Sequence, residues 1–351
     1  MARSGEAKIQ TEARQGKAGF QAGRGRAQRT TMEQAPILAI GNVFYYALAI
    51  LGIPANVVTL LTLQLRDCGL SNSTNIYLVS MAAADIIVLI FYVGMNRILV
   101  PRFSQYFHLF TMVCRFELIM IAAVVDCSVW LTVSFTFDRF VAVCCQGFKR
   151  RYCTAKTATL MVSTVYLLTY ARNLPYYFTV LPYIVYKGQQ IGCKTNPAVY
   201  SVPGWRAFYW LHTVLTPFVP FATIILFNLL TIWHIVVASR VRQSFHSDGA
   251  SGDAELRNRR RAMVLLFAAS ASFISLWVST VGLFLFSRIT NTYFYRNFND
   301  PFAVVNEISR MLRVLNCCSS TCMYALTQSK FREELKSLGK SYKNLIWKVL
   351  Q

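Results

Sequence analysis

The chain has 351 residues, of which 55% are hydrophobic and 14% aromatic, whereas only 15% are charged. This composition is too apolar for an ordinary soluble protein and predicts that a lipid bilayer is its main solvent. A formal net charge of +21 would suggest a nucleic-acid partner for a soluble chain. Here the basic and the apolar residues occupy separate segments, which is typical of membrane proteins, so we expect no nucleic-acid partner.

The N-terminal segment differs from the rest of the chain. Residues 1–34 are rich in Gly, Ala, Arg and Gln and contain no apolar stretch that would resemble a cleavable signal peptide. We expect a disordered extracellular leader, in which Met32 is an alternative start to Met1. The first apolar span must then direct insertion into the membrane.

Seven apolar stretches follow, covering residues 35–65, 75–97, 111–143, 156–181, 206–239, 262–287 and 302–327. Each is long enough to cross a bilayer, for which about 20 mostly apolar residues are needed. Glu307, Arg310 and Arg313 interrupt the last stretch, so a six-span protein is the alternative. The pattern predicts an all-α integral membrane protein, with a bundle of seven transmembrane helices over residues 35–327.

Basic residues indicate the orientation, because lysines and arginines near span ends stay in the cytoplasm. They are frequent in the segments around residues 139–156 and 240–261 and after residue 330, and sparser in the alternate loops, to which we assign Arg97 and Arg172. This favours an N-terminus outside the cell and a cytoplasmic C-terminus.

The C-terminal segment 328–351 has an amphipathic pattern. Phe331, Leu335 and Leu338 recur at helical spacing among lysines. We expect a short helix on the anionic inner leaflet, with a solvated amphipathic helix as the alternative.

The inner end of the third span contains Asp138, Arg139 and Phe140. It resembles the Asp-Arg-Tyr signature of rhodopsin-like (class A) G-protein-coupled receptors, with Phe140 in place of the tyrosine. The resemblance implies a multi-pass receptor of the plasma membrane, in which Arg139 meets a heterotrimeric G protein. The alternative is a guanidinium that only reaches the lipid headgroups.

Other landmarks of that family follow in order along the chain. They are Asn56, Asp85, Pro220, the aromatic pair Phe273 and Trp277 of the sixth span, and Tyr324 of the seventh. The resemblance implies that Phe273, Trp277 and Tyr324 take part in activation. It also implies a disulfide bond between Cys114 and Cys193.

Several positions depart from the family pattern. Ser279 replaces the sixth-span proline, Asn228 replaces the fifth-span tyrosine, and the fourth-span tryptophan is missing near Val165. Arg259 stands where an acid would pair with Arg139. These changes leave the activation motion open, and a ligand-independent receptor is one alternative.

Longer sequence segments narrow the resemblance to one branch of the family. Tyr45-Tyr46, Leu51 to Asn56, Ala82 to Leu89 and Asn173-Leu-Pro-Tyr-Tyr are similar to G-protein-coupled receptor 139 and its close relatives. That branch implies a response to tryptophan and phenylalanine and coupling to Gq-type proteins. A divergent receptor for another small molecule or short peptide is the alternative.

Helical geometry places Glu117, Ile121, Val124 and Ser128 on one face of the third span, which we assign to the bundle centre. Ile121 occupies the position of the aspartate in receptors for biogenic amines, so a monoamine ligand is not expected. Val314 likewise lacks the amine that a retinal Schiff base requires.

Glu307, Arg310 and Arg313 lie on one stripe of the last span, and charges within a membrane face a cavity or each other. We expect Arg313 or Arg310 to bind a ligand carboxylate and Glu117 to face an amine, above an aromatic floor that includes Trp277. The alternative is a salt bridge between Glu117 and Arg310 that ties two helices.

Two further polar groups are expected inside the bundle. Asp126 should face spans four and five, where it could pair with His212, although His212 could also be a ligand contact or a neutral ring. Asp85, Ser128, Asn316 and Ser320 resemble the allosteric sodium cluster of the family. Beyond that ion, no cofactor is expected.

Competing functions find less support in the residues. A membrane transporter would show repeat symmetry and broken helices in matching halves, and the sequence contains no such repeat. The chain also contains no grouping of nucleophile and base and no metal-ligand spacing, so we do not expect an enzyme.

Overall fold

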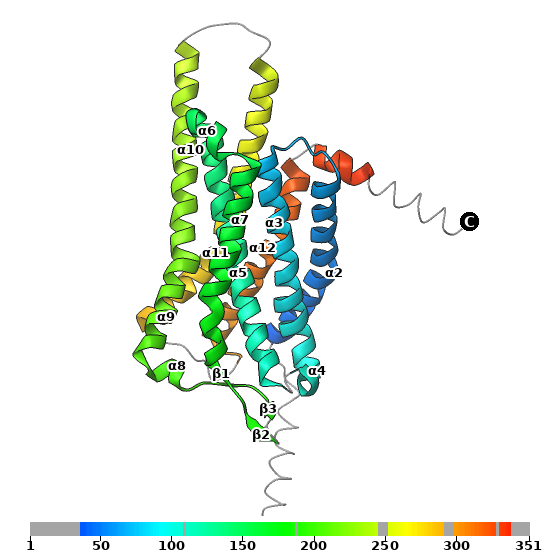
Figure 1. The fold of residues 1–351 in the computed structure, drawn as a ribbon, viewed down its shortest axis with the longest axis vertical. Helices are drawn as coiled ribbons and strands as arrows, with labels where there is room; N and C mark the ends of the chain where they lie inside the picture. Colours follow the sequence, from blue (N-terminus) through cyan, green and yellow to red (C-terminus); the bar gives the residue numbers. More distant parts are fainter. Residues whose placement is uncertain are drawn as a thin grey trace, which may run out of the picture.

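The computed structural model describes residues 36–107, 110–186, 189–244, 252–290, 298–327 and 330–337. These residues form a bundle of long, roughly parallel helices (Figure 1). The leader 1–34, both candidate start residues and Leu338 lie outside the described residues. The same is true of the side chains of Arg259, Ser320 and Tyr324, although the backbone of each is helical.

Within this part of the chain, the first four spans correspond to α2 (Pro36–Leu65), α3 (Asn72–Val88), α5 (Thr111–Cys144) and α7 (Ala155–Asn173). The second span continues through the π-helix η2 (Leu89–Leu99) into α4 (Val100–Phe107). The fifth span consists of α9 (Pro203–Thr213), the π-helix η4 (Val214–Phe218) and α10 (Val219–Ser244). The last two spans are α11 (Gly252–Thr290) and α12 (Pro301–Thr327).

Short elements connect the spans. They are α6 (Gln146–Tyr152), the 3-10 helix η3 (Leu174–Thr179), α8 (Ala198–Ser201), and the strands β1 (Val180–Leu181), β2 (Ile184–Tyr186), β3 (Gln189–Ile191) and β4 (Lys194–Thr195). The strands pair antiparallel as β1 with β4 and β2 with β3, with Val180 opposite Thr195 and Ile184 opposite Ile191.

Five described segments, Pro36–Leu65, Asn72–Phe103, Thr111–Cys144, Pro203–Val237 and Ser270–Ser287, are long and apolar enough to cross a membrane. α7 and the charged α12 complete the bundle, and α12 packs against both α11 and α2. Large apolar side chains such as Leu51, Leu167 and Trp233 lie exposed on the outside, as a lipid-facing surface requires. The predicted seven-helix bundle is confirmed.

Helix starts and irregular turns follow from local sequence. The Ser71 and Thr154 hydroxyls cap α3 and α7 by accepting hydrogen bonds from the backbone N–H groups of Thr74 and Thr157. Pro217 lies inside η4, three residues before Pro220 in the first turn of α10. A proline lacks the N–H that continues an α-helical ladder, which explains a wider turn here.

α5 lies at the centre of the bundle, in contact with α3, α7, α10 and α11. Its buried side chains join three apolar clusters. Leu131 and Phe135 pack with Tyr77 near one end, Val124 packs with Tyr92 and Val314 near the other, and Val129 and Val133 pack with Phe273 and Trp277 between them.

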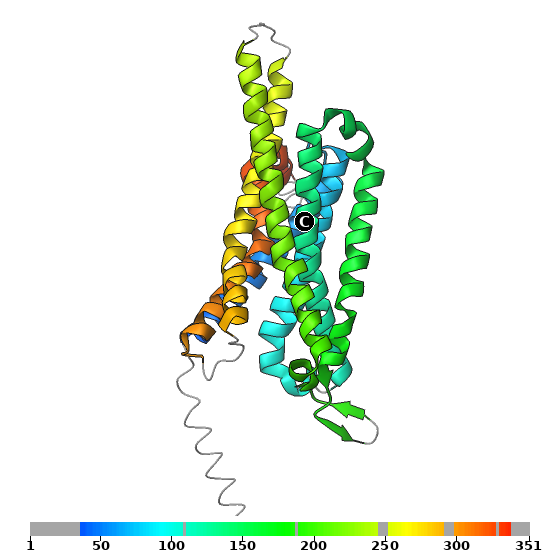
Figure 2. The same cartoon turned by 90° about the vertical axis from the view of Figure 1, so that its left-hand side faces the viewer.

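The two ends of the bundle differ. β2 and β3 project from one end, whereas α6 lies at the other, beyond which α10 and α11 extend (Figures 1 and 2). Residues 330–337 form a helix at the α6 end. Its Phe331 is buried in the cluster of Leu63 and Tyr77, and Leu335 packs against that cluster, so this segment docks on the bundle rather than lying free in solvent.

Candidate functional site

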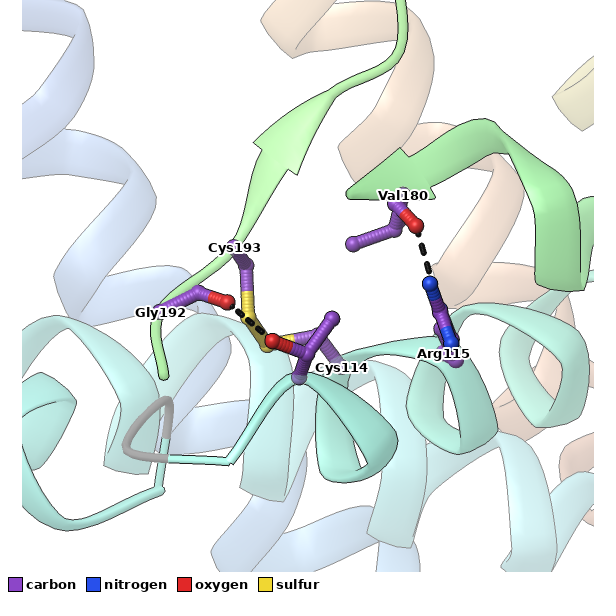
Figure 3. The surroundings of a disulfide bond; sticks show 6 residues. Cys114, Arg115, Val180, Gly192 and Cys193 are labelled. Atoms are coloured by element: carbon purple, nitrogen blue, oxygen red, sulfur yellow. Dashed lines mark hydrogen bonds between the residues drawn. A yellow bond between two sulfur atoms is a disulfide. The ribbon is translucent and has the colours of Figure 1, made fainter. Parts of the chain in front are cut away.

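A disulfide bond closes the end of the bundle from which β2 and β3 project. It joins Cys114 in the first turn of α5 to Cys193 after β3, as predicted (Figure 3). The Thr111 hydroxyl donates a 2.7 Å hydrogen bond to the Gly192 carbonyl, and Arg115 Nε donates a 3.1 Å bond to the Val180 carbonyl. We call this the disulfide end, and the opposite end the Arg139 end.

Gly192 has a specific role beside the disulfide. Its φ of +75° is one that residues with a side chain rarely adopt, and an added Cβ would lie 2.7 Å from Tyr183 Cβ. The chain can therefore turn tightly enough to bring Cys193 over α5.

Charged residues of span seven pair with one another and with span two. Arg310 Nη1 donates a 2.8 Å hydrogen bond to Glu307 Oε1, and Arg97 of η2 binds Oε2 of the same carboxylate. Arg97 Nη2 also donates a 3.0 Å bond to the Tyr45 hydroxyl. The ion pairs of the described residues give Arg310 a different partner from the alternative pair with Glu117, since Arg310 binds the acid one turn away on its own helix.

Arg313 has a different environment from Arg310. Its guanidinium lies 6.0 Å from the Trp277 ring centroid and 5.9 Å from that of Tyr92. Among the described residues, no carboxylate lies within ion-pair distance of it. Trp277 stacks on Phe273 at 5.4 Å, and the Trp277 Nε1 atom is buried with no hydrogen-bond acceptor in the described part of the chain.

The predicted inward face of the third span is buried. Glu117, Val124 and Ser128 are almost inaccessible, and Ile121 is partly buried within the cluster of Tyr92 and Val314. Glu117 lies about one helical turn nearer to the disulfide end than Ile121. The centre of the bundle thus combines a carboxylate with aromatic and aliphatic walls.

Asp126 lies at the junction of spans three, four and five. Its carboxylate binds Arg172 and accepts hydrogen bonds from Asn173 Nδ2 at 2.6 Å and Thr216 Oγ1 at 2.8 Å. His212 Nε2 lies 3.4 Å from the same carboxylate, which confirms the predicted pairing. The assignment of Arg172, like that of Arg97, to an outer loop is wrong, since both extend from helices and bind buried carboxylates.

Part of the predicted sodium cluster comes together in mid-bundle. The Ser128 hydroxyl donates a 3.0 Å hydrogen bond to Asp85 Oδ1, and both side chains are buried. Asn316, which precedes Cys317 in α12, is also buried, and its Oδ1 accepts a 3.4 Å hydrogen bond from the Ser319 hydroxyl. Asn56 donates a 2.9 Å bond to the Cys317 carbonyl and so ties α2 to α12.

At the opposite end, Asp138 holds Arg139. The two side chains form an ion pair, and the Ser73 hydroxyl of α3 donates a 2.6 Å hydrogen bond to Asp138 Oδ1. The Cys153 thiol lies 3.6 Å from the Asp138 carbonyl oxygen. Arg139 is thus held against its own helix at the mouth of the bundle.

Phe137 and Phe140, which flank Asp138 and Arg139 in the sequence, pack against aromatic rings of other elements. Phe140 stacks on Phe227 of α10 at 5.3 Å, and Phe137 lies 5.1 Å from Phe227 and 5.2 Å from Tyr152. Asn228, which follows Phe227 in α10, is buried. The phenylalanine that replaces the signature tyrosine therefore packs within a ring cluster between spans three and five.

Sequence reasoning missed several members of these clusters. Arg97, Arg172 and Ser73 bind the acids identified above, yet each lies on a different helix from its partner. Asn173 belongs to the Asn173-Leu-Pro-Tyr-Tyr segment noted in the sequence, but that segment does not by itself indicate a contact with Asp126. Periodicity within one helix cannot supply such partners.

Comparisons with known proteins agree with this architecture. The family described as 7 transmembrane receptor (rhodopsin family) matches residues 55–320. The chain is 24% identical to the melatonin receptor type 1B of Rattus norvegicus over 87% of this chain and 78% of that protein. It is 20% identical to the allatostatin-A receptor of Bombyx mori, over 83% and 76% of the two chains. It is 22% identical to the somatostatin receptor type 3 of Homo sapiens, over 84% and 68%.

The family match covers the bundle from the second half of α2 to residue 320 within α12, and each of these relatives aligns with more than four fifths of the chain. They are matches to receptors and not to enzymes. The chain therefore belongs to the rhodopsin family of seven-transmembrane receptors, the class A G-protein-coupled receptors, which lie in the plasma membrane and signal through G proteins.

Proposed function

We propose that this receptor binds a small ligand with a carboxylate and an aromatic ring, such as tryptophan or phenylalanine, and activates a Gq-type protein. The observation that carries the proposal is the environment of Arg313. Its guanidinium faces the rings of Trp277 and Tyr92 and no described carboxylate. A partly buried cation without a counter-ion favours an anionic ligand.

The neighbouring arginines support the choice of Arg313. Glu307 carries a single charge and already pairs with Arg97 and Arg310. Those two guanidinium groups are therefore less available to a ligand. Arg313 is the member of the span-seven stripe that can form a new bidentate pair with a carboxylate.

The other groups of an aromatic amino acid find matching chemistry. Trp277, Phe273 and Tyr92 offer aromatic surface, and the buried Trp277 Nε1 is a donor that a ligand oxygen could use. Glu117 supplies a carboxylate on the facing helix for the ligand ammonium group. His212, by contrast, is engaged with Asp126, so we place it outside the direct ligand contacts.

The chemistry at the two ends of the bundle supports an orientation with the disulfide end outside the cell. Disulfides persist in oxidising compartments outside the cytosol, whereas Lys149, Arg150 and Arg151 cluster in α6 at the Arg139 end. We therefore propose an N-terminus outside and a C-terminus in the cytoplasm. Coupling to Gq rests on the resemblance to the branch of G-protein-coupled receptor 139.

An allosteric sodium ion remains a prediction for the middle of the bundle. Asp85 and Ser128, which are hydrogen-bonded to each other, would hold it, and Asn316 could add an amide oxygen. The ion would compensate the buried charge of Asp85.

The experiment is a signalling assay in cells that express the full chain. Tryptophan, phenylalanine, the other common amino acids and melatonin are added, and Gq, Gi and Gs activation are measured in parallel. Arg313→Gln removes hydrogen bonds to a charged group worth about 2 to 3 kcal/mol, so affinity should fall roughly 30- to 160-fold. Arg206→Gln, which alters an exposed arginine of α9, is the matched control.

Surface expression of each variant is measured by antibody labelling of intact cells. The proposal requires that Arg313→Gln reach the surface normally and shift its dose response to roughly 30- to 160-fold higher ligand concentrations. An unchanged dose response would remove Arg313 from the site. Nucleotide exchange that is high without ligand and insensitive to the whole panel would instead favour the ligand-independent alternative.

A further inference from the structure

A small cavity near the disulfide end reaches the charged residues that join spans two and seven. It measures about 250 Å³ and lies between α2, η2, α4 and α12. Its polar part is formed by Tyr45, Arg97 and Glu307, and its apolar part by Ile37, Leu38 and Pro101. Pro101 is exposed, at the start of α4 near the disulfide end (Figure 1), whereas Tyr45 and Glu307 are buried. The cavity therefore leads from the surface to the buried ion pair.

The polar part of this cavity carries an excess of positive charge. Arg97 and Arg310 both pair with Glu307, which sets two guanidinium groups against one carboxylate. Within the described ranges of the chain, no second acid pairs with either arginine. The side chains of Arg97 and Glu307 are only 21% and 4% exposed, so water screens this charge incompletely. One monovalent anion in the cavity would neutralise the cluster.

Two hydrogen-bond donors of the cavity lining are unused. Arg97 bonds through its Nη2 atom, to Glu307 and to the Tyr45 hydroxyl, and its Nε atom is buried with no acceptor in the described part of the chain. The Tyr45 oxygen accepts the bond from Arg97, and the described hydrogen bonds give the hydroxyl proton no acceptor. Buried donors are normally satisfied in folded proteins. An oxygen-rich anion would supply the acceptors that these two groups lack.

The apolar part of the cavity indicates an organic anion rather than a halide. Ile37, Leu38 and Pro101 offer hydrocarbon surface on which an apolar tail can be buried. At about 30 Å³ for each water-sized group, the cavity holds about eight heavy atoms, which corresponds to a carboxylate of up to about six carbons. Tryptophan and phenylalanine exceed this size. An amino acid would also bring an ammonium group, which would leave the excess positive charge in place.

We propose that this cavity is a second ligand site, which binds a small aliphatic monocarboxylate. The carboxylate lies beside Arg97 and accepts the proton of the Tyr45 hydroxyl, while the tail lies in the apolar part. Glu307 already occupies Nη2 of Arg97, so the contact is weaker than the bidentate pair proposed for Arg313. Arg313 lies six residues after Glu307, which is about 9 Å further along α12. The two sites are therefore distinct.

The test uses the purified full receptor in bilayer nanodiscs, with trifluorobutyrate as the probe. Broadening of its fluorine NMR signal reports binding, and empty nanodiscs give the background from partition into lipid. Binding should be saturable, and butyrate should displace the probe. Butyramide, which has nearly the same shape without the charge, should not displace it. The amino acid of the same chain length should displace it only weakly, because its ammonium group restores the excess positive charge.

Three variants locate the probe. Arg97→Gln should abolish saturable binding. Tyr45→Phe keeps the ion pair of Arg97 with Glu307 and should weaken binding about tenfold, as expected for one lost hydrogen bond to a charged group. Arg102→Gln is the matched control, because Arg102 is an exposed neighbouring arginine whose guanidinium lies over the Tyr46 ring and does not line the cavity. Melting temperatures are measured in parallel, and Tyr45→Phe decides the matter if Arg97→Gln does not fold.

A fourth variant, Arg313→Gln, separates this site from the proposed amino-acid site. It should bind trifluorobutyrate like the native chain, whether or not the response to tryptophan depends on Arg313. The proposal would be overturned by equal displacement with butyramide, or by displacement with sodium chloride at the concentrations at which butyrate acts. Unweakened binding to Tyr45→Phe, or loss of binding in Arg313→Gln or Arg102→Gln, would overturn it as well.

Discussion

Asp126 on α5 and Arg172 on α7 form an ion pair inside the bundle, where the carboxylate is 1% exposed and the guanidinium side chain 17% exposed. Thr216 of the fifth span binds the same carboxylate. One acid thereby joins three neighbouring spans.

Replacement of Asp126 should destabilise the receptor. Asp126→Ala leaves Arg172 without its counter-ion and should cost about 3 kcal/mol, the lower end of the range for a broken buried pair. Asp126→Asn keeps the shape and should cost less. Thermal unfolding of the purified receptor measures both. The double variant Asp126→Asn, Arg172→Gln should recover part of the loss, and an unaltered melting temperature in both single variants would show that the pair contributes nothing.

Release of Arg139 should raise basal signalling. Asp138→Asn weakens the ion pair that holds Arg139 against its own helix, and about 1.5 kcal/mol of lost restraint shifts a two-state ratio about tenfold. Ser73→Ala, which removes one hydrogen bond to Asp138, should act in the same direction but less strongly. Ligand-free nucleotide exchange on purified G protein is the measurement.

The matched control is Ser134→Ala, since this buried hydroxyl bonds only to the Trp130 carbonyl of its own helix among the described residues. Arg139→Gln should abolish exchange under every condition. Full exchange by Arg139→Gln, or basal exchange of Asp138→Asn equal to that of the native chain, would contradict the role given to this pair.

The thiol of Cys153 should react slowly at neutral pH. Burial, followed by the charge of Asp138, raises the pKa of this thiol to about 11. Because the thiolate is the reactive form, only roughly one thiol in a thousand is reactive at pH 8, and the fraction grows as pH rises toward that pKa. The rate of Cys153 labelling by N-ethylmaleimide, resolved by peptide between pH 7 and 10, measures this thiolate fraction. The reference is the same cysteine in the denatured chain; equal rates in both states at pH 8 would rule out a raised pKa.

Loss of the disulfide should weaken the folded state. Cys114 and Cys193 are separated by 79 residues, and closing a loop of this size contributes about 4.5 kcal/mol in the chain-entropy account. We expect Cys114→Ser to lower both surface expression and the melting temperature. Cys322→Ser, which alters an exposed free cysteine, is the control and should behave like the native chain. Equal melting temperatures for the two variants would contradict this estimate.

Much of the architecture could be predicted from the sequence. Apolar stretches located the spans, and a rotation of about 100° per residue placed Glu117 and Ser128 inward and turned Asp126 toward His212. These inferences succeed because they depend on geometry within one helix and on the contrast between lipid and protein.

The errors have a common physical cause. Arg97 and Arg172 stand near span ends, where counting of basic residues assigns them to loops. A long guanidinium side chain at such a position can equally reach back into the bundle when a buried acid is there to receive it. Which helix carries the acid is a property of tertiary packing, so the partners Glu307 and Asp126 could not be assigned in advance.

The π-helix η2 determines where Arg97 is aimed. A π-turn holds more backbone per revolution than an α-turn, so rewinding residues 89–99 into an α-helix of the same length would turn its last residues about the helix axis. Arg97 would then point away from Tyr45 and Glu307. Of these two arginines, only Arg310 would still pair with Glu307. The winding of one transmembrane segment thus sets the charge balance of another, and insertions or deletions there would retune the receptor without altering any residue that a ligand contacts.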